Sequence, residues 1–244
     1  MKTVVITGCN RGIGKGLMEH FASQGWHVIA IVRKTSEEFQ QELSRLSEVY
    51  HVPLTPVFAD LSDKDSLASA VEKVSEMNCV IDVLINNAGI NISRPVFYLD
   101  YEDVEKSFKV NYFAPFFLSK EIGRLMIGQQ SGVILNITSV AGLTAQPGGA
   151  AYDASKAALN MFTKSLALEL APFGVRVNAV ACSVVETDMY KDLKPEVQKK
   201  ILKRVALKRP STINEVAGVI DFLASEKASY MTGQIVQVDG GYTL

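Results

Sequence analysis

The sequence predicts an α/β fold in which a doubly wound parallel sheet of seven strands is covered by helices on both faces. Seven apolar runs of strand length recur along the 244 residues, and segments with helical periodicity separate them. The runs are apolar on consecutive residues, as expected of strands that are buried on both faces. Uninterrupted alternation of strand and helix is typical of a parallel sheet. We therefore expect a single domain over residues 1–244.

The expected strands are short and rich in β-branched residues, and they lie at 3–7, 27–32, 54–59, 80–86, 133–138, 175–181 and 234–239. The helices expected between them carry apolar residues three and four positions apart, and they lie at 12–23, 37–49, 64–77, 101–127, 151–170, 195–205 and 213–225. Pro115 falls inside the longest helix. Because proline removes a backbone hydrogen bond, we expect a kink or a local adjustment there and no domain boundary.

Composition and charge exclude several classes of function. The 25 basic and 26 acidic side chains nearly cancel, and no basic stripe marks a nucleic-acid surface. No apolar run approaches the length of a membrane span, and the first residues resemble no secretion signal. Three cysteines without paired spacing, and three isolated histidines, favour neither a disulfide framework nor a metal site. We expect a cytoplasmic protein with no nucleic-acid, membrane or metal partner.

The first expected strand ends in a glycine-rich turn that leads directly into a helix. The turn contains Gly8, Asn10, Arg11, Gly12, Ile13 and Gly14. Glycines at this spacing let the backbone turn tightly and approach a pyrophosphate, whose charge the helix N-terminus stabilises. A strand before the turn and a helix after it make a ligand-free turn the weaker interpretation. The segment predicts a dinucleotide site in a Rossmann-type fold.

The end of the second expected strand indicates which dinucleotide is bound. Folds that bind NAD usually place an acidic residue there, to accept hydrogen bonds from the ribose hydroxyls. This chain has Arg33 and Lys34 instead, with Arg11 nearby in the first turn. Basic side chains would neutralise a 2′-phosphate, so NADP(H) is the expected cofactor. A solvated basic corner remains the alternative, more so for Lys34 than for Arg33.

Polar side chains also follow the fourth and fifth expected strands. Asn87, Ala88 and Gly89 come at the carboxyl end of the fourth strand, where open α/β sheets bind their ligands. Ser139 follows the fifth strand, and the helix after it begins with Tyr152 and Lys156.

Tyr152 and Lys156 stand four residues apart, so they share one face of the helix. The ammonium is expected to stabilise the phenolate and lower the pKa of Tyr152, which suits the phenol for acid/base catalysis. Ser139 is expected to donate a hydrogen bond to the substrate oxygen. This tyrosine-lysine spacing alone is common and usually marks an ordinary helix face. Its combination with the preceding motifs favours an active site.

With the glycine-rich turn, the Asn-Asn-Ala-Gly segment, Asn111, Ser139, Tyr152 and Lys156 in order, the sequence resembles the short-chain dehydrogenase/reductase family over essentially its whole length. The resemblance implies an oxidoreductase (EC 1.1.1.-) that moves a hydride between NADP(H) and a ketone or secondary alcohol. It implies that Asn111 kinks a helix and holds a proton-relay water. It also implies that Tyr152 and Lys156 contact the cofactor, Lys156 through the nicotinamide ribose.

The resemblance implies further cofactor contacts in the middle and late parts of the chain. Asp60 and Leu61 match the positions beside the adenine, and Val185 and Thr187 match those beside the nicotinamide carboxamide. For Asp60 the alternative is a helix N-cap, and one residue can do both.

Within the family the sequence looks most like the 3-oxoacyl-(acyl-carrier-protein) reductases of fatty-acid biosynthesis, and two departures weaken that assignment. Cys182 and Ser183 replace a family Pro-Gly pair, which puts the turn beside the nicotinamide in doubt and leaves a reactive thiol as a minor possibility. The ends of the two long helices, MIGQQSG and ELAPFGV, carry no basic side chain, and only Arg124 and Arg176 flank them. Steering of an acidic carrier protein is therefore expected to be weak.

Two other functions stay open. The enzyme alternative is a dehydrogenase of a sugar, polyol or secondary-metabolite alcohol, which the substrate loop at 91–99 and the lid at about 188–205 would decide. The alternative of another class is a catalytically silent NADP-binding regulatory protein.

A homotetramer or homodimer is expected, because the long helices expose more apolar residues than one sheet face would cover, namely Phe113, Phe116, Phe117, Met161 and Phe162.

Overall fold

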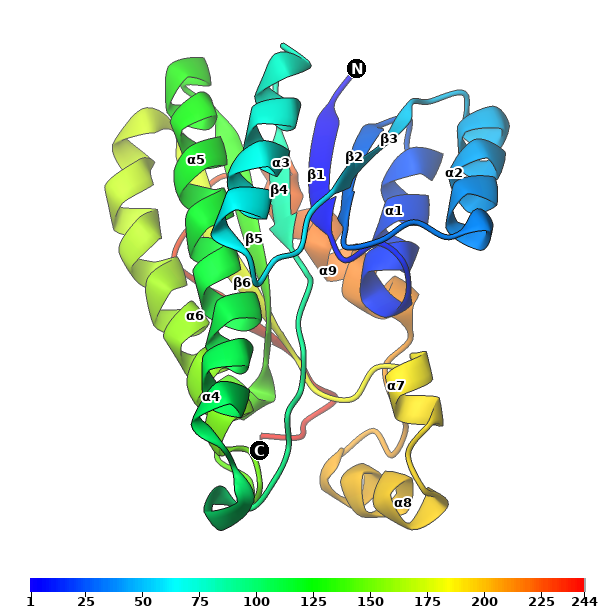
Figure 1. Ribbon diagram of the computed structural model, residues 1–244, viewed down its shortest axis with the longest axis vertical. Coiled ribbons are helices and arrows are strands. Elements are labelled where there is room, and N and C mark those ends of the chain that lie inside the picture. The colour runs from blue at the N-terminus through cyan, green and yellow to red at the C-terminus, as the bar shows by residue number, and fades with distance from the viewer. Residues whose placement is uncertain (244) are drawn as a thin grey trace.

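All seven expected strands form in the computed structural model, which describes residues 1–243 except for the side chain of Met189. They make one sheet in the order β3-β2-β1-β4-β5-β6-β7, and every pairing is parallel (Figure 1). The strands are β1 (Thr3–Thr7), β2 (His27–Val32), β3 (Leu54–Phe58), β4 (Val83–Asn86), β5 (Gly132–Ser139), β6 (Val175–Cys182) and β7 (Ile235–Val238). The predicted doubly wound sheet is confirmed.

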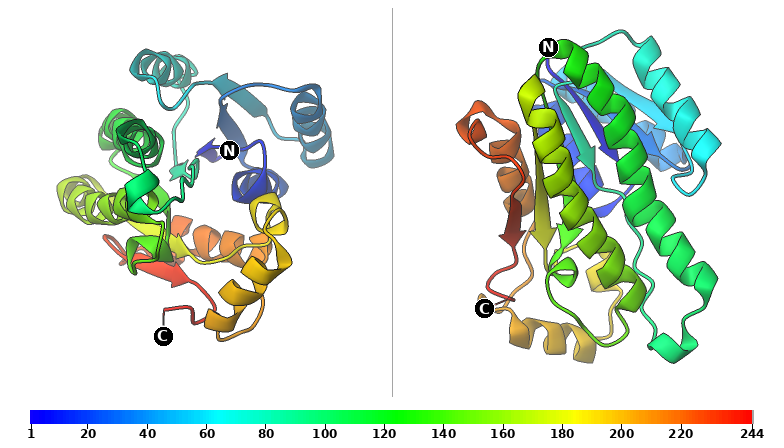
Figure 2. Two further views of the ribbon diagram at one scale, coloured as in Figure 1. Left: turned by 60° about the horizontal axis from the view of Figure 1, so that its bottom comes forward. Right: turned by 90° about the vertical axis from the view of Figure 1, so that its left-hand side faces the viewer.

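Helices cover both faces of the sheet (Figure 2). One face packs against α1 (Gly12–Ser23), α2 (Glu37–Tyr50) and α9 (Ile213–Ala224). The other packs against α3 (Lys64–Glu76), α5 (Ala114–Gln129) and α6 (Ala150–Leu170). The remaining helices are α4 (Tyr101–Phe108), α7 (Asp188–Lys191) and α8 (Pro195–Arg204), of which α7 and α8 fall in the segment expected to form a lid. Within the described residues, no helix has the length and apolarity needed to cross a bilayer.

The long helix expected at 101–127 is interrupted, although not at the predicted place. A π-helical segment, Lys109–Phe113, separates α4 from α5, whereas Pro115 lies undistorted in the first turn of α5. A proline inside a helix has no N–H to donate to the carbonyl four residues earlier, and its ring crowds that carbonyl. For Pro115 this carbonyl belongs to Asn111, the middle residue of the π-helical segment. The interruption expected at Pro115 thus lies one helical turn earlier, at Asn111, the residue for which the family resemblance implied a kink.

The fourth strand is shorter than expected, because residues 80–82 precede the ladder. Ile81 is nevertheless fully buried, and the Asp82 carboxylate accepts a hydrogen bond of 2.7 Å from the backbone N–H of Thr3. The apolar run at 80–86 thus predicted the burial of Ile81 correctly, but a buried residue need not lie in a strand. The backbone N–H and carbonyl of Ile81 are bonded instead by the side chain of Gln129, at 3.0 and 2.9 Å.

Candidate active site

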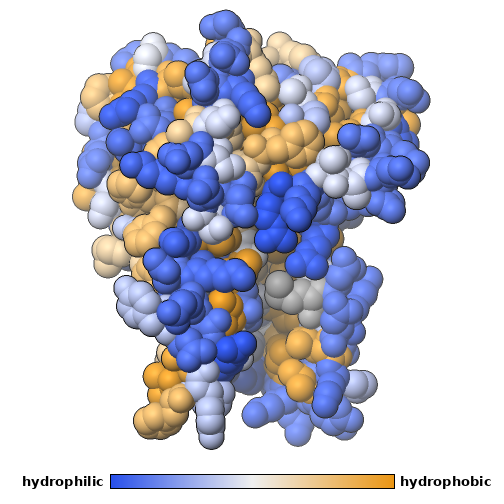
Figure 3. All heavy atoms as spheres, in the orientation of Figure 1, coloured by the Kyte–Doolittle hydropathy of each residue, from blue (hydrophilic) through white to orange (hydrophobic). Residues whose placement is uncertain are grey.

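The carboxyl ends of β1, β4, β5 and β6 open into a single cleft of about 460 Å³. Strand order reverses between β1 and β4, and open α/β sheets bind their ligands at such a switch point. Figure 3 shows the surface hollowed between the lobe of α4 and the lobe of α7 and α8. The cleft residues that sequence reasoning predicted are Gly8, Asn10, Arg11, Gly12, Ile13, Asn87, Ala88, Gly89, Ser139, Tyr152, Lys156, Val185 and Thr187.

The glycine-rich turn is shaped to admit a ligand against the backbone. Gly8 and Gly12 have φ angles of 78° and 57°, a left-handed conformation that favours glycine. A Cβ at Gly8 would lie 3.0 Å from the Cα of Ala88, and one at Gly14 would overlap the carbonyl of Gly8. Arg11 precedes α1 without a side-chain cap, so the first N–H groups of the helix remain available. These features fit a dinucleotide pyrophosphate.

The buried hydroxyl of Thr7, which sequence reasoning missed, holds the segment of Asn87 and Ala88 that lines the cleft. Thr7 Oγ1 accepts hydrogen bonds from the backbone N–H groups of Asn87 and Ala88, at 3.0 and 2.9 Å. Asn87 Nδ2 in turn donates to the Thr7 carbonyl at 2.8 Å. The ends of β1 and β4 are thereby joined. The position of Thr7, directly before the glycine-rich turn, was the signal that could have identified it.

Asn111 lies behind the cleft wall and fastens it to the helices. Its Oδ1 accepts a hydrogen bond from the backbone N–H of Ile90, and its Nδ2 donates to the Ile90 carbonyl, both at 2.9 Å. Nδ2 also donates to Ser155 Oγ at 3.0 Å, and Asn111 is fully buried. A Cβ at Gly89 would lie 3.3 Å from both Asn111 Oδ1 and Lys156 Nζ. The side chain of Asn111 therefore positions the neighbourhood of Lys156 and does not face the cleft.

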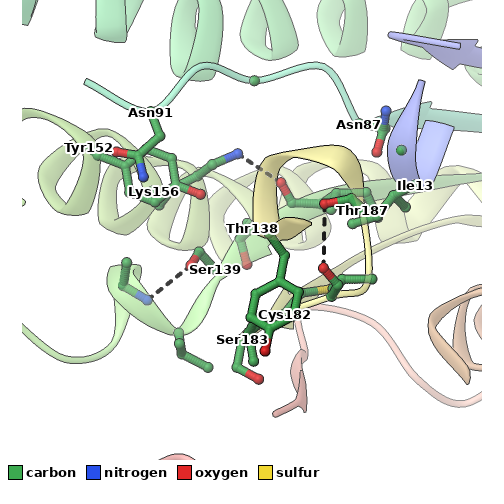
Figure 4. A pocket seen from close by; sticks show the side chains of 18 of the residues that line it. Ile13, Asn87, Asn91, Thr138, Ser139, Tyr152, Lys156, Cys182, Ser183 and Thr187 are labelled. Carbon is green, nitrogen blue, oxygen red and sulfur yellow. Dashed lines mark hydrogen bonds between the residues drawn. The ribbon is translucent and has the colours of Figure 1, made fainter. Parts of the chain in front are cut away.

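Ser139, Tyr152 and Lys156 come together at the far end of the cleft (Figure 4). Ser139 ends β5, where its Oγ accepts a hydrogen bond of 3.2 Å from the backbone N–H of Ala141. Tyr152 stands in the first turn of α6, and Lys156 follows one turn later. Lys156 Nζ lies 5.9 Å from the centre of the Tyr152 ring and donates to the Ile137 carbonyl at 2.9 Å. The predicted shared helix face is present.

Burial shifts the pKa values of both Lys156 and Tyr152. It lowers the pKa of the Lys156 ammonium to about 8. It also raises the pKa of the Tyr152 phenol, and the Ser139 hydroxyl only partly opposes that rise. The pKa of Tyr152 is therefore raised in this structure, where a lowered pKa was expected, because burial of the phenol has the largest effect on it. A neutral phenol is suited to donate a proton to a carbonyl oxygen.

The structure accounts for the departure from the family at Cys182 and Ser183. Cys182 ends β6 beside Ser139, and burial raises the pKa of its thiol to about 12, which argues against the reactive-thiol alternative. Ser183 donates from its backbone N–H to the Val238 carbonyl at 3.3 Å and from its Oγ to the Asp239 carbonyl at 3.1 Å. A glycine would lack this second bond. The serine ties the turn to the C-terminal segment.

The residues expected around the adenosine lie beyond the lining of the cleft, at the ends of β2 and β3. Arg33 and Lys34 are exposed, and Asn10 Nδ2 donates to the Lys34 carbonyl at 3.1 Å. Hydrogen bonds from Ser62 chiefly lower the pKa of Asp60, and the charge of Arg33 adds to that effect.

Asp60 does not cap the following helix. Asp63 caps α3 instead, by accepting from the Ser66 N–H at 2.7 Å, so the N-cap alternative for Asp60 was wrong. Leu61 is half-buried and packs against the core of the α3 face. Asp60 is left with its carboxylate at the end of β3, in the position expected for it.

Further lining residues were not named individually from the sequence, although Asn91, Tyr190, Leu193 and Ile201 lie in the expected substrate loop and lid. They are Ile90, Asn91, Thr138, Val140, Ala141, Thr144, Gln146, Tyr190, Leu193, Ile201 and Tyr242. Thr187 Oγ1 donates to the Val185 carbonyl at 3.3 Å, and Val185 pairs with Ser211, which anchors the start of the lid. Loop and lid residues of this kind lack a spacing that could be recognised in the sequence.

Comparison with known proteins places this geometry in a family. A family profile described as enoyl-(acyl carrier protein) reductase matches residues 8–243. The chain is 39% identical over 240 residues, 98% of its length and 96% of the relative's, to a 3-oxoacyl-(acyl-carrier-protein) reductase of Aquifex aeolicus. It is 35% identical to a 3alpha-hydroxysteroid dehydrogenase of Mediterraneibacter gnavus, over 98% and 96% of the two chains.

Solved structures agree with this placement. A putative NAD(P)-dependent gluconate 5-dehydrogenase of Beutenbergia cavernae, with bound NADP, has a TM-score of 0.91 at 33% identity, over 99% of this chain and 96% of that one. A 4-hydroxyisoleucine dehydrogenase complexed with NADH has a TM-score of 0.90 at 31% identity, over 100% and 99%. The chain belongs to the short-chain dehydrogenase/reductase family of nicotinamide-dependent oxidoreductases.

Proposed function

We propose that this protein uses NADPH to reduce the ketone of a 3-oxoacyl thioester. The observation that carries the proposal is the group of Ser139, Tyr152 and Lys156 in the same cleft as the glycine-rich turn. The left-handed glycines and the close approach of Gly8 to Ala88 fit the cofactor, which supplies the hydride when bound. The similarity to 3-oxoacyl-(acyl-carrier-protein) reductases supports this substrate class.

The residues of the chain supply the proton and orient the carbonyl. Tyr152 donates its phenolic proton to the carbonyl oxygen as the carbonyl carbon is reduced, and Ser139 donates a hydrogen bond to the same oxygen. The Lys156 ammonium, held at the Ile137 carbonyl, stabilises the phenolate that forms and binds the nicotinamide ribose. Asn111 keeps the π-helical segment in place beside Lys156, where a relay water would be held.

The alternative is a dehydrogenase of a sugar, polyol or secondary-metabolite alcohol. Leu193, Ile201 and Val140 contribute apolar walls that suit an acyl chain, whereas Asn91, Thr144 and Gln146 are polar partners of the kind that a polyol needs, so turnover decides between the two. The catalytically silent alternative is disfavoured because all three catalytic side chains are present in one cleft. Reduction of a free acetoacetyl thioester by the purified protein with NADPH tests the proposal directly. Turnover of polyols alone would favour the alternative enzyme.

Arg33 is expected to set the preference for NADPH over NADH. Its exposed guanidinium at the end of β2 has the charge and geometry to bind a 2′-phosphate. Replacing Arg33 by Ala should lower kcat/KM for NADPH by about tenfold or more and leave kcat/KM for NADH nearly unchanged. Steady-state kinetics with both cofactors measure the effect, with Arg45→Ala on the neighbouring helix as a control. Equal losses with the two cofactors would contradict the assignment.

A carrier protein is expected to add little to recognition at the ends of α5 and α6. Arg124 pairs with Glu121 at 2.7 Å, and Arg176 donates to the carbonyls of Leu223 and Ser225, at 2.8 and 3.1 Å. Arg176 is used inside the fold, and the charge of the exposed Arg124 is offset by Glu121. We predict that kcat/KM for an acetoacetyl group on acyl carrier protein stays within about threefold of that for a free thioester analogue. A large preference for the carrier-bound form that high salt removes would contradict this prediction.

We also propose a homotetramer or homodimer that is built on α5 and α6. The two helices lie side by side across one face of the molecule (Figure 2). Their outer surfaces expose Phe113, Phe116 and Met161, with exposed fractions of 50%, 42% and 62%. Phe117 and Phe162 are half-buried beneath them. Sedimentation of the protein at micromolar concentration as a monomer would contradict this proposal.

A further inference from the structure

Helix α8 of the lid concentrates positive charge that the rest of the chain does not have. Residues 195–208 contain one acidic side chain, Glu196, and five basic ones, whereas the whole chain has a formal net charge of -1. The basic residues are Lys199, Lys200, Lys203, Arg204 and Lys208, and all are exposed. Within the described part of the chain none of the five forms an ion pair, although acidic residues pair with eight other basic groups. The charge is therefore available to an anion.

The geometry of α8 directs two of these cations toward the mouth of the cleft. Ile201 lines the cleft, and residues three and four apart share a helix face. Arg204, three residues after Ile201, lies on that side, and its guanidinium carbon is 4.1 Å from the centre of the Tyr242 ring, which also lines the cleft. Lys200 stands one turn before Arg204 on the same edge. Lys199 lies on the opposite side of the helix from Ile201, because each residue turns the helix by 100°.

The position of Arg204 is stabilised by the C-terminal segment. The Asp239 carboxylate accepts hydrogen bonds from the N–H groups of Gly241 and Thr243, at 2.9 and 3.1 Å. Leu207, just after α8, donates its N–H to the Gly240 carbonyl at 3.1 Å. Stacking on Tyr242 occupies the face of the guanidinium and leaves its N–H edges free, an arrangement suited to a phosphate.

The interior of the cleft has a different character. Around the reacting group the lid and loops present neutral side chains, namely Thr144, Gln146, Tyr190, Leu193 and Ile201, and one acidic side chain, Asp188. The reacting end of the substrate is thus expected to be uncharged and partly apolar. A cationic rim outside a cleft whose lid side carries neutral residues and Asp188 fits a substrate whose anionic group is remote from its carbonyl. In Figure 3 the lobe of α7 and α8 likewise shows hydrophilic atoms outside and hydrophobic atoms toward the hollow.

We propose that Lys200 and Arg204 bind the phosphate groups of a coenzyme A thioester while its 3-oxoacyl end enters the cleft. This inference rests on the proposed function, because it assumes that the reacting group is carried on a thioester. A carrier protein is the less favoured source of negative charge. Stable protein interfaces bury roughly 800 Å² on each partner, and here the cleft-facing charge is confined to one edge of a ten-residue helix.

Binding of the coenzyme A portion of the proposed substrate can be measured without turnover. Calorimetric titration of the protein saturated with NADP⁺ would compare coenzyme A with pantetheine, which lacks the phosphates. We expect coenzyme A to bind about tenfold more tightly at low salt, since charge-assisted hydrogen bonds are made at an exposed site. The Lys200→Gln/Arg204→Gln variant should lose this advantage, and Arg204→Lys should retain part of it. The Lys199→Gln/Lys203→Gln variant removes the same charge from the outer side and should retain it fully.

Three results would overturn the inference. Coenzyme A could bind no more tightly than pantetheine, or the two double variants could lose affinity equally, which would indicate a nonspecific effect of net charge. Alternatively, Lys200→Gln/Arg204→Gln could abolish binding of acyl carrier protein and leave coenzyme A unaffected. Failure to reduce any 3-oxoacyl thioester would count against the proposed function alone, because the titration reports the phosphate site independently of turnover.

Discussion

Replacing Tyr152 by Phe is expected to lower kcat by about three orders of magnitude and to leave the affinity for NADPH close to that of the wild type. The variant removes the phenolic hydroxyl that lies with Ser139 and Lys156 in the cleft and keeps the ring that packs beside Lys156. Single-turnover oxidation of bound NADPH by a 3-oxoacyl thioester measures the chemical step. Fluorescence titration measures the affinity for NADPH separately.

Two comparisons make the result for Tyr152 specific. Ser139→Ala should cause a smaller loss, because it removes a hydrogen bond to the substrate oxygen and spares the proton donor. Tyr190→Phe, at another tyrosine that lines the cleft, should keep most of the activity if its hydroxyl takes no part in proton transfer. A Tyr152→Phe variant with more than about a tenth of wild-type kcat would refute the assigned role.

Replacing Lys156 by Ala is expected to damage both binding and rate, with losses of about tenfold in NADPH affinity and about a hundredfold in kcat. The ammonium is almost fully buried, donates to the Ile137 carbonyl and lies close to Gly89, so no neighbouring cation replaces it there. Lys164→Ala, at an exposed lysine of the same helix, is the matched control and should leave both quantities unchanged. Normal kcat in Lys156→Ala would exclude its role in proton transfer.

The pH dependence offers an independent test of Lys156. Burial lowers the pKa of its ammonium to about 8, so the charged form is present below that pH and is lost above it. Because kcat/KM for NADPH reports the free enzyme, this ratio should fall as pH rises through about 8. Lys156→Arg, which stays charged, should remove the fall even if its activity is low. A wild-type profile that is flat to pH 10 would contradict the assigned charge state.

Most of the sheet could be predicted because burial on both faces leaves a simple pattern. The runs at residues 3–7 and 27–32 correspond to β1 and β2 at both ends. The prediction was less accurate where a side chain replaced a backbone partner, as Gln129 does beside Ile81. The break in the long helix lies at Asn111, as the family resemblance implied, and one turn before Pro115; contacts from Asn111 to Ile90 and Ser155, which are distant in sequence, help to fix it there.

The sequence by itself determined the fold, the dinucleotide site and the group of Ser139, Tyr152 and Lys156, because glycine conformation, strand burial and helix spacing are local properties. Tertiary structure decided the charge states. The desolvation that raises the pKa of Tyr152 and lowers that of Lys156 arises from segments that meet only in the fold. Tertiary structure also decided which cations are free: Arg176 is used internally, whereas Arg204 faces the cleft mouth over Tyr242. Basic side chains can be counted in the sequence, but whether each of them can meet a ligand depends on the groups that lie beside it in the fold.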